Sequence, residues 1–555
     1  MLKRSAAPPN PPGLIQRSTL SALLRAPLAR ARIRRRGLFA EMASLADSVT
    51  AEHSAAAGER TGGPRVLIAQ IKAGAVLSGY SAVLAQALRL RGADIGVLIC
   101  GGGQPICEVG WGRRTYPFPC NRCTYFTQTW AKAQRLPVFR VSEGLPWGRN
   151  AARAPVAVPE DANGDVDYVA ATETSVPRFF LAAEHELMPF SEDVSRDFAV
   201  SAYGVAQAVG PVLDRFAPDI VVMVNGLTTS EAVVRRLAEL RGIRTVTYSS
   251  GMLPGTLFFS NDEPAERMSS DKGWRQEADR PLTAEQEAMI HEYLEGRSAG
   301  RHTYERYYRS PRSEGLLEEL GVDPSARVVT VFSNITWDTA CLNRNIGFES
   351  MRQWVLTTIE AARAHARTAL IVRIHPDEVG WGSTETLAGA IREAFPELPP
   401  NVRVVAPEES ISSYALMDAS DLVMTYTSTV GLEAAVRGLP VAVCGDAHYR
   451  GKGFTIDVEG PEHLHALLAG EAEETTDAAR GLRYAFMFFH RLCVPFPAVV
   501  PQTAGASAVD IDALERIPTG AAELTPGADP YVDFVCEQLL GGGDFVLPEA
   551  LVRPA

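Results

Sequence analysis

Short apolar runs alternate with longer segments in which apolar residues recur every three or four positions. Runs such as Val66–Ala69 and Ile95–Ile99 are typical of parallel strands buried on both faces, and helical patterns follow them. The same alternation starts again at Arg327, with further apolar runs at 369–374, 402–405 and 422–425. This order of elements predicts an α/β fold built on two mainly parallel sheets.

The length of the chain fits two domains. At 555 residues with 46% hydrophobic composition, the chain can bury more than one core. A polar, proline-containing stretch, 261–325, separates the two series of strands and indicates surface helices that lead into a linker. We therefore expect a leader over residues 1–62, Rossmann-like domains over 63–325 and 326–500, and a tail over 501–555.

The leader differs in charge from the rest of the chain. Residues 1–36 contain nine Lys or Arg and no acid, although the whole chain has a net charge of −12. We expect a disordered basic leader, with Met42 as an alternative start; a transit peptide and a lipid-binding arm remain alternatives. The acidic body argues against nucleic-acid binding, and no apolar run is long enough to span a membrane.

Four of the eight cysteines fall close together, at Cys100, Cys107, Cys120 and Cys123. The C-x2-C pair can place two thiolates on one metal ion, and the upstream pair could complete a tetrahedral zinc site. The upstream spacing matches no common zinc pattern, so a redox-sensitive site and ordinary buried or surface thiols stay open. The other four cysteines are scattered, which suits reduced thiols in a cytoplasmic protein.

Polar residues follow the predicted strands of the second series. In open α/β sheets, ligands bind at the carboxyl ends of the strands, so these side chains are candidates for one crevice. Pro376 biases the residue before it towards an extended conformation, which holds a histidine at a strand end. The candidates are Asn334, Asp338, Arg373, His375, Ser428, Thr429, Glu433, Arg450 and Lys452.

The stretch 421–441 is the centre of this group, because it predicts a strand, a turn and a helix start. A helix start with free N–H groups suits a phosphate, and Glu433, one turn further on, could accept hydrogen bonds from sugar or ribose hydroxyls. Gly431 would let a ligand approach closely. An ordinary βαβ corner with a capped helix is the alternative.

Residues 327–457 resemble the donor half of bacterial capsule polysaccharide biosynthesis glycosyltransferases, a GT-B family. The resemblance is looser over residues 64–325. It is carried by Phe332–Asp338, Arg373–Pro376, Thr427–Ala435, Gly438–Val441 and His448–Phe454.

The resemblance implies a GT-B fold, in which two Rossmann-like domains face each other across a cleft and the C-terminal segment crosses back to the first domain. A nucleotide-sugar donor would bind the C-terminal domain, a glycan or glycolipid acceptor the N-terminal one, and no cofactor or metal would be required. By analogy His375 contacts the donor phosphate, Ser428 and Thr429 cap it, and Glu433 holds hydroxyls.

We therefore expect a metal-independent glycosyltransferase that extends a capsule or other surface polysaccharide, with hexosyl and ulosonic-acid transfer both open. A nucleotide-sugar epimerase of the same fold and a catalytically silent binding protein are the alternatives. The general base is expected among N-terminal acids. Glu184 and Glu186 beside His185 are candidates, although base rates favour a solvated acidic face for them. A cytoplasmic location follows, with peripheral association at the inner membrane face as an addition.

Overall fold

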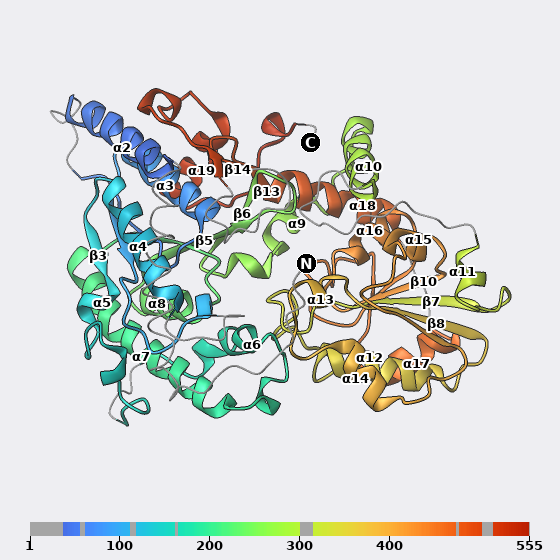
Figure 1. Cartoon of the computed structure of the whole chain (residues 1–555). Coiled ribbons are helices and arrows are strands. Elements are labelled where there is room, and N and C mark those ends of the chain that lie inside the picture. The colour runs from blue at the N-terminus through green and yellow to red at the C-terminus, as the bar shows by residue number, and fades with distance from the viewer. Residues whose placement is uncertain are drawn as a thin grey trace. The chain divides into compact units, whose positions relative to one another are not determined.

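The computed structural model describes residues 37–55, 62–110, 118–160, 165–299, 315–472, 477–501 and 514–553. The chain divides into two compact units, each with its own sheet (Figure 1). Unit 1 comprises Met1–Phe180, His185–Met268 and Cys493–Val552. Unit 2 comprises Leu181–Glu184, Ser269–Leu492 and Arg553–Ala555.

Unit 1 is built on a seven-stranded sheet in the order β13, β6, β5, β4, β1, β2, β3. Neighbouring strands from β5 to β3 are parallel, whereas β6 and β13 each run antiparallel to their neighbours. The strands are β1 (Arg65–Ala69), β2 (Asp94–Ile99), β3 (Val138–Arg140), β4 (Ile220–Val224), β5 (Arg244–Ser250), β6 (Thr256–Asn261) and β13 (Cys493–Pro495).

Strand β1 shows why the central strands are continuous apolar runs. Val66 and Ile68 point into one core cluster, and Leu67 and Ala69 point into the other. Successive side chains of a strand face opposite sides of a sheet, so a sheet covered on both sides needs apolar residues at every position. The helices of the first cluster are α2 (Leu38–Ala55), α3 (Ala75–Leu90), α4 (Phe118–Ala133) and α19 (Pro530–Gly541); those of the second include α7 (Ser191–Phe216) and α8 (Thr229–Glu239).

The prediction of a disordered leader is wrong for the helix Leu38–Ala55. Helix α2 begins at Leu38, and Met42, Leu45 and Val49 are completely buried in unit 1. These residues are three or four positions apart, so they form one apolar face that the core covers. Residues 1–36, with the arginine-rich stretch, lie outside the described part of the chain.

Unit 2 contains a six-stranded sheet in the order β12, β11, β10, β7, β8, β9, and all its neighbours are parallel. One face packs on α12 (Met351–Ala362), α14 (Leu387–Ala394) and α17 (Pro461–Ala469). Helices α10 (Ala284–Ser298), α16 (Val430–Val436) and α18 (Ala478–Phe486) form a second group of packed helices. The strands are β7 (Arg327–Phe332), β8 (Thr368–Arg373), β9 (Val402–Val405), β10 (Leu422–Thr425), β11 (Val441–Val443) and β12 (Ile456–Asp457).

The predicted α/β class is confirmed, with one doubly wound unit and a second parallel sheet. The units divide at different places from those expected: the main segment of unit 2 begins at Ser269 and not near residue 325, because α10 packs against α18 of the same unit. The C-terminal segment Cys493–Val552 belongs to unit 1, where β13 extends the sheet beyond β6 and α19 packs against α3.

Candidate functional site

Three loops of unit 2 meet where β7, β8 and β10 end. The parallel register pairs Phe332 with both Arg373 and Thr425, so the residues that follow these strands emerge at one edge of the sheet. Two hydrogen bonds join the loops: the His375 N–H donates to Ser333 Oγ (3.1 Å), and the Thr427 N–H donates to Asn334 Oδ1 (3.3 Å). The strand-end residues of three separate motifs therefore form one site.

His375 has a defined tautomer in this site. The backbone N–H of Asp377 donates to His375 Nδ1 (3.1 Å), so Nδ1 carries the lone pair and the neutral ring carries its proton on Nε2. The side chain is half-buried. A half-buried Nε2–H group is suited to donate a hydrogen bond to an anionic oxygen.

Ser428 and Thr429 lie directly before α16 and are both half-buried. Ser428 Oγ accepts a long hydrogen bond from the Val430 N–H (3.4 Å), whereas Thr429 occupies the N-cap position without a side-chain cap. Helix α16 has only seven residues. Its start brings the two hydroxyls to the edge where Asn334 lies, since Asn334 bonds the adjacent Thr427.

The structure explains the glycine at position 431 differently from the expectation that it lets a ligand approach. A Cβ at this position would lie 2.2 Å from the hydroxyl oxygen of Tyr449. That hydroxyl donates to the carbonyl oxygen of Ser428 (2.6 Å) and also contacts Thr425 Oγ1 at 3.0 Å. The missing side chain therefore makes room for a buried tyrosine that fixes the loop, and not for a ligand.

The expectation that Glu433 holds donor hydroxyls disagrees with the structure. Its side chain is 1% exposed, Oε1 lies 3.0 Å from Arg297 Nε, and Tyr414 donates to Oε2 (2.5 Å). Both carboxylate oxygens are thus engaged within the fold. A buried carboxylate needs such partners, because its desolvation is otherwise unfavourable.

The other charged candidates are also engaged in internal contacts. Arg373 is buried, and its Nη1 donates to the Ala406 carbonyl (2.7 Å). Arg450 donates to the carbonyls of Val443 (2.7 Å) and Val458 (2.9 Å), which ties together the ends of two strands.

Asp338 and Lys452 are likewise engaged. Asp338 accepts from the Ala340 N–H (3.2 Å) and closes its own turn, and Lys452 is ion-paired with Asp271. The open candidates are therefore Asn334, His375, Ser428 and Thr429. Sequence reasoning quoted Ser333 and Tyr449 within its motifs but gave neither a role, although the position of Ser333 directly after a predicted strand was a usable signal.

His448, from the last motif of the resemblance, lies within an aromatic group. Its ring stacks on Phe488 (4.0 Å between centroids), and Nδ1 lies 2.8 Å from the Tyr484 hydroxyl. Burial, with smaller contributions from Arg344 and Lys452, lowers the pKa of His448 to about 3. His448 is therefore neutral at physiological pH and acts in packing.

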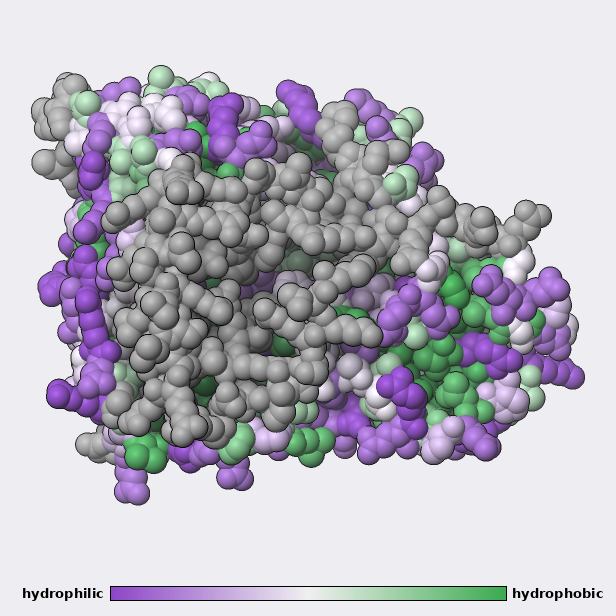
Figure 2. All heavy atoms as spheres, viewed as in Figure 1, coloured by the Kyte–Doolittle hydropathy of each residue, from purple (hydrophilic) through white to green (hydrophobic). Residues whose placement is uncertain are grey.

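Apolar side chains are exposed on unit 2, and Figure 2 shows hydrophobic residues gathered on the face of this unit that is in view. Val379 and Trp381, which follow His375 in the chain, are 51% and 40% exposed. The ring of Trp381 meets the buried Trp337 edge-on, with centroids 6.4 Å apart. An exposed aromatic surface beside the loop of His375 is suited to contact the apolar face of a bound molecule.

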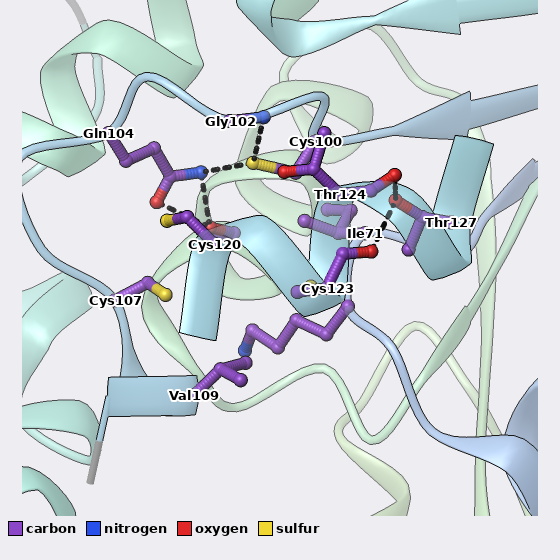
Figure 3. A pocket seen from close by; sticks show the side chains of 12 residues that line it. Ile71, Cys100, Gly102, Gln104, Cys107, Val109, Cys120, Cys123, Thr124 and Thr127 are labelled. Atoms are coloured by element: carbon purple, nitrogen blue, oxygen red, sulfur yellow. Dashed lines mark hydrogen bonds between the residues drawn. The ribbon is translucent and has the colours of Figure 1, made fainter. Parts of the chain in front are cut away.

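Unit 1 has a pocket of its own at the carboxyl ends of β1 and β2 (Figure 3). Lys72 at its wall forms ion pairs with Glu108 (3.0 Å) and Glu231 (2.7 Å). Burial opposes the charge of Lys72, but the two carboxylates more than offset it, so the pKa of Lys72 is raised. The pocket is lined by Ile71, Lys72, Cys100, Gly102, Gln104, Cys107, Val109, Cys120, Cys123, Thr124, Thr127 and Ser230.

The acids expected near His185 do not form a group. Glu184 belongs to unit 2, where it is ion-paired with Arg352 and its N–H donates to Glu385 (3.0 Å). Glu186 is largely exposed and lies 3.5 Å from His185 Nε2. Glu186 is therefore part of an exposed acidic surface. Glu184 makes contacts that stabilise the fold.

Within the described ranges, no helix is both long enough and apolar enough to cross a bilayer. The described residues also include no group of three or more His, Cys, Asp or Glu at a spacing that fits one metal ion.

Comparison with known proteins places the sequence match in unit 2. Residues 295–484 match a family model described as "Capsule polysaccharide biosynthesis protein". A comparison with curated proteins gave no match.

Solved structures with a similar fold include a β-Kdo 2,4-transferase, KpsC of Thermosulfurimonas dismutans (16% identity, 48% of this chain and 79% of that chain, TM-score 0.31). A UDP-GlcNAc 2-epimerase from Neisseria meningitidis, solved with UDP-GlcNAc, is also similar (11% identity, 76% and 96%, TM-score 0.24). The family match covers the loops of Asn334, His375 and Ser428 that the structure joins into one site. The segment 295–484 therefore matches the capsule polysaccharide biosynthesis family, as its motifs predict.

Proposed function

We propose that this protein is a glycosyltransferase that moves a sugar from a nucleotide-sugar donor to a capsule or other surface polysaccharide acceptor. The observation that carries the proposal is the joining of three family motifs at the carboxyl edge of the unit 2 sheet, through the bonds of His375 to Ser333 and of Thr427 to Asn334. Ligands bind at this edge in open parallel sheets.

The chemistry assigned to the site is stabilisation of the leaving nucleotide. When the bond between sugar and phosphate breaks, negative charge develops on the phosphate oxygens, and fixed donors aimed at them lower the barrier. His375 Nε2–H is such a donor, because the Asp377 N–H fixes the tautomer from the other side of the ring. The hydroxyls of Ser428 and Thr429 are further donors for the same phosphate.

Metal independence belongs to the same proposal. The donors of the site are neutral N–H and O–H groups, which can act on a phosphate without a bridging cation. We expect donor turnover to persist in EDTA, with no added cofactor. A complete loss in EDTA that Mg²⁺ restores would contradict this part of the proposal.

The test is incubation of the full chain with a panel of nucleotide sugars, including UDP-hexoses and CMP-linked ulosonic acids, with and without a capsule oligosaccharide. Acceptor-dependent release of the nucleotide, together with acceptor extension seen by mass spectrometry, is the expected result. The donor that supports extension also decides between hexosyl and ulosonic-acid transfer.

The same assay separates the alternatives. Isomerised nucleotide sugar formed without acceptor would identify an epimerase. Donor binding without turnover would identify a silent binding protein. Either result would overturn the proposal.

For the location, we propose a cytoplasmic enzyme that meets its acceptor at the inner membrane face. Recovery of the native protein in the periplasmic fraction would contradict this location.

A further inference from the structure

A half-exposed carboxylate lies at the carboxyl edge of the unit 2 sheet, in the loop directly after β11. It belongs to Asp446, whose side chain is 49% exposed. Arg344 Nη1 donates to Asp446 Oδ2 (3.0 Å), whereas no hydrogen bond or ion pair from another described residue reaches Oδ1. One oxygen of this carboxylate is therefore held, and the other faces outwards with its acceptor capacity unused.

The sheet register places Asp446 beside the loop that follows β10. Val423 pairs with Val441 and Thr425 with Val443. Two more backbone bonds continue this parallel ladder beyond the strands, from the Cys444 N–H to the Thr425 carbonyl (2.9 Å) and from the Gly445 N–H to the Tyr426 carbonyl (3.1 Å). Asp446 comes next, so its backbone leaves the sheet beside the loop that carries Ser428 and Thr429.

Arg344 fixes the position of Asp446 from the interior. The side chain of Arg344 is only 10% exposed. Its Nη1 also donates to the Asp446 carbonyl (3.1 Å), and the Asp446 N–H donates to the Arg344 carbonyl (2.8 Å). Backbone and side chain of Asp446 are thus both tied to one buried residue, which is unusual for an exposed acid on a loop.

The residue after Arg344 joins the same loops a second time. Asn345 forms an isolated antiparallel bridge with Gly445, and its Oδ1 accepts from the Tyr426 hydroxyl (2.6 Å). The Tyr426 side chain is completely buried. The loops after β7, β10 and β11 are therefore fastened together, and Asp446 is part of the same rigid edge as Asn334 and Ser428.

From this placement we propose that Asp446 binds sugar hydroxyls of the nucleotide-sugar donor, the role that the motif pattern gave to Glu433. The inference rests on the proposed function, because it concerns the same donor. Carboxylate oxygens only accept hydrogen bonds, and hydroxyls are the donors that a nucleotide sugar offers close to its phosphates. These hydroxyls belong to the ribose or to the transferred sugar.

The ion pair with Arg344 also answers the question of charge. A bare carboxylate would repel the phosphates of the donor. The guanidinium of Arg344, 3.0 Å from Oδ2, offsets this repulsion and leaves Oδ1 as an acceptor. Asp446 can therefore contribute to binding an anionic ligand.

The experiment is calorimetric binding of UDP, CMP and the corresponding nucleotide sugars to the full chain and to Asp446→Ala. We expect affinity to fall about 10- to 100-fold, the range for a lost hydrogen bond to a charged group. A fall for the free nucleotides assigns the contact to the ribose. A fall for the nucleotide sugars alone assigns it to the transferred sugar.

A conservative variant separates hydrogen bonding from charge. Asp446→Asn keeps an acceptor oxygen, so its affinity should lie between those of Asp446→Ala and the parent. If Asp446 acted through its charge alone, both variants would bind the anionic donor more tightly than the parent. Tighter binding by both would overturn the inference.

Asp418→Ala is the matched control. Asp418 forms an ion pair of the same length with Arg437 (3.0 Å), and its side chain is 45% exposed, but it precedes β10 and so lies towards the amino end of that strand. This variant should bind every probe like the parent. In Asp446→Ala, Arg344 keeps its bond to the backbone carbonyl, so thermal unfolding should show a folded protein.

The outcomes distinguish this inference from the proposed function. Equal affinity of Asp446→Ala and the parent for all probes overturns the role of Asp446, whereas acceptor extension by the parent still decides the transferase function. If the parent binds nucleotides but extends no acceptor, the transferase function fails, and the affinity ratio still decides the role of Asp446. A parent protein that binds none of the probes overturns the inference as well.

Discussion

Glu433 shows how a single residue can have a different role from the one its position in a motif indicates. It lies one turn inside α16, where a ligand-binding acid was expected, yet its carboxylate faces Arg297 and Tyr414 in the interior. If Glu433 held donor hydroxyls, its removal would lower donor affinity. Because its carboxylate is buried within the fold, we expect its removal to lower stability instead.

We predict that Glu433→Ala lowers the free energy of unfolding by about 3–5 kcal/mol, the usual effect of leaving one partner of a buried ion pair. Denaturant unfolding of the purified variant measures it. The double variant Glu433→Ala, Arg297→Met should recover part of the loss, because the buried cation is removed too. Glu360→Ala, in an exposed pair with Arg363, is the control and should change stability by less than about 1 kcal/mol. An unchanged Glu433→Ala protein would contradict the buried pair.

For His375 we predict a fall in turnover with little change in donor affinity. Loss of a donor that acts on developing charge lowers kcat by about 100- to 1,000-fold. An interaction made only in the transition state leaves ground-state binding intact. Steady-state kinetics of His375→Ala, together with calorimetric donor binding, give the two quantities.

The matched control for His375 is His291→Ala, an exposed histidine in α10 of the same unit. It should keep the activity of the parent protein. Equal turnover by both variants would remove His375 from the site.

At the scale of the element, α2 is the clearest departure from expectation. Its composition is that of an ordinary amphipathic helix, but it follows a basic stretch that favoured a disordered leader. The helix is held by burial of its apolar face and by Phe39, whose ring meets Phe126 of α4 edge-on at 5.1 Å.

We predict that Met42→Ala destabilises unit 1 by about 2–5 kcal/mol, the range for removing a buried large side chain from a packed core. The side chain of Met42 is fully buried, so its truncation removes contacts on all sides and leaves a cavity in the core. Thermal unfolding measures the change. Glu52→Ala, an exposed position of the same helix, should have little effect. If both substitutions are equally mild, α2 does not pack as described.

At the scale of the whole molecule, the C-terminal segment completes the unit that the N-terminal half begins. Val532, Val535, Cys536 and Leu539 of α19 are buried in the same cluster as α3. Arg91 at the end of α3 is ion-paired with Asp533. Helix α19 is thus part of the same core as β1 and α3.

We predict that removal of residues 525–555 destabilises unit 1 and leaves unit 2 protected. Hydrogen exchange should become faster in α3, which loses its packing partner, and in β1 of the same core cluster, but not in β7 and β8. Mass spectrometry of the deuterated peptides resolves the two units. Equal protection of β1 before and after the deletion would contradict this assignment of the C-terminal segment.

The sequence by itself determined the central strands of both sheets, the loops that follow them and the family match of the segment 295–484. Continuous apolar runs identify strands covered on both faces, and residues such as His375 must follow a strand wherever that strand lies. Side-chain partners were decided only by the tertiary structure. Glu433 meets Arg297 from a helix more than a hundred residues earlier in the chain, and Gly431 faces Tyr449 from a later loop. Local patterns carry no information about such distant contacts, so whether a polar residue faces a ligand or the core depends on the packing of the whole unit.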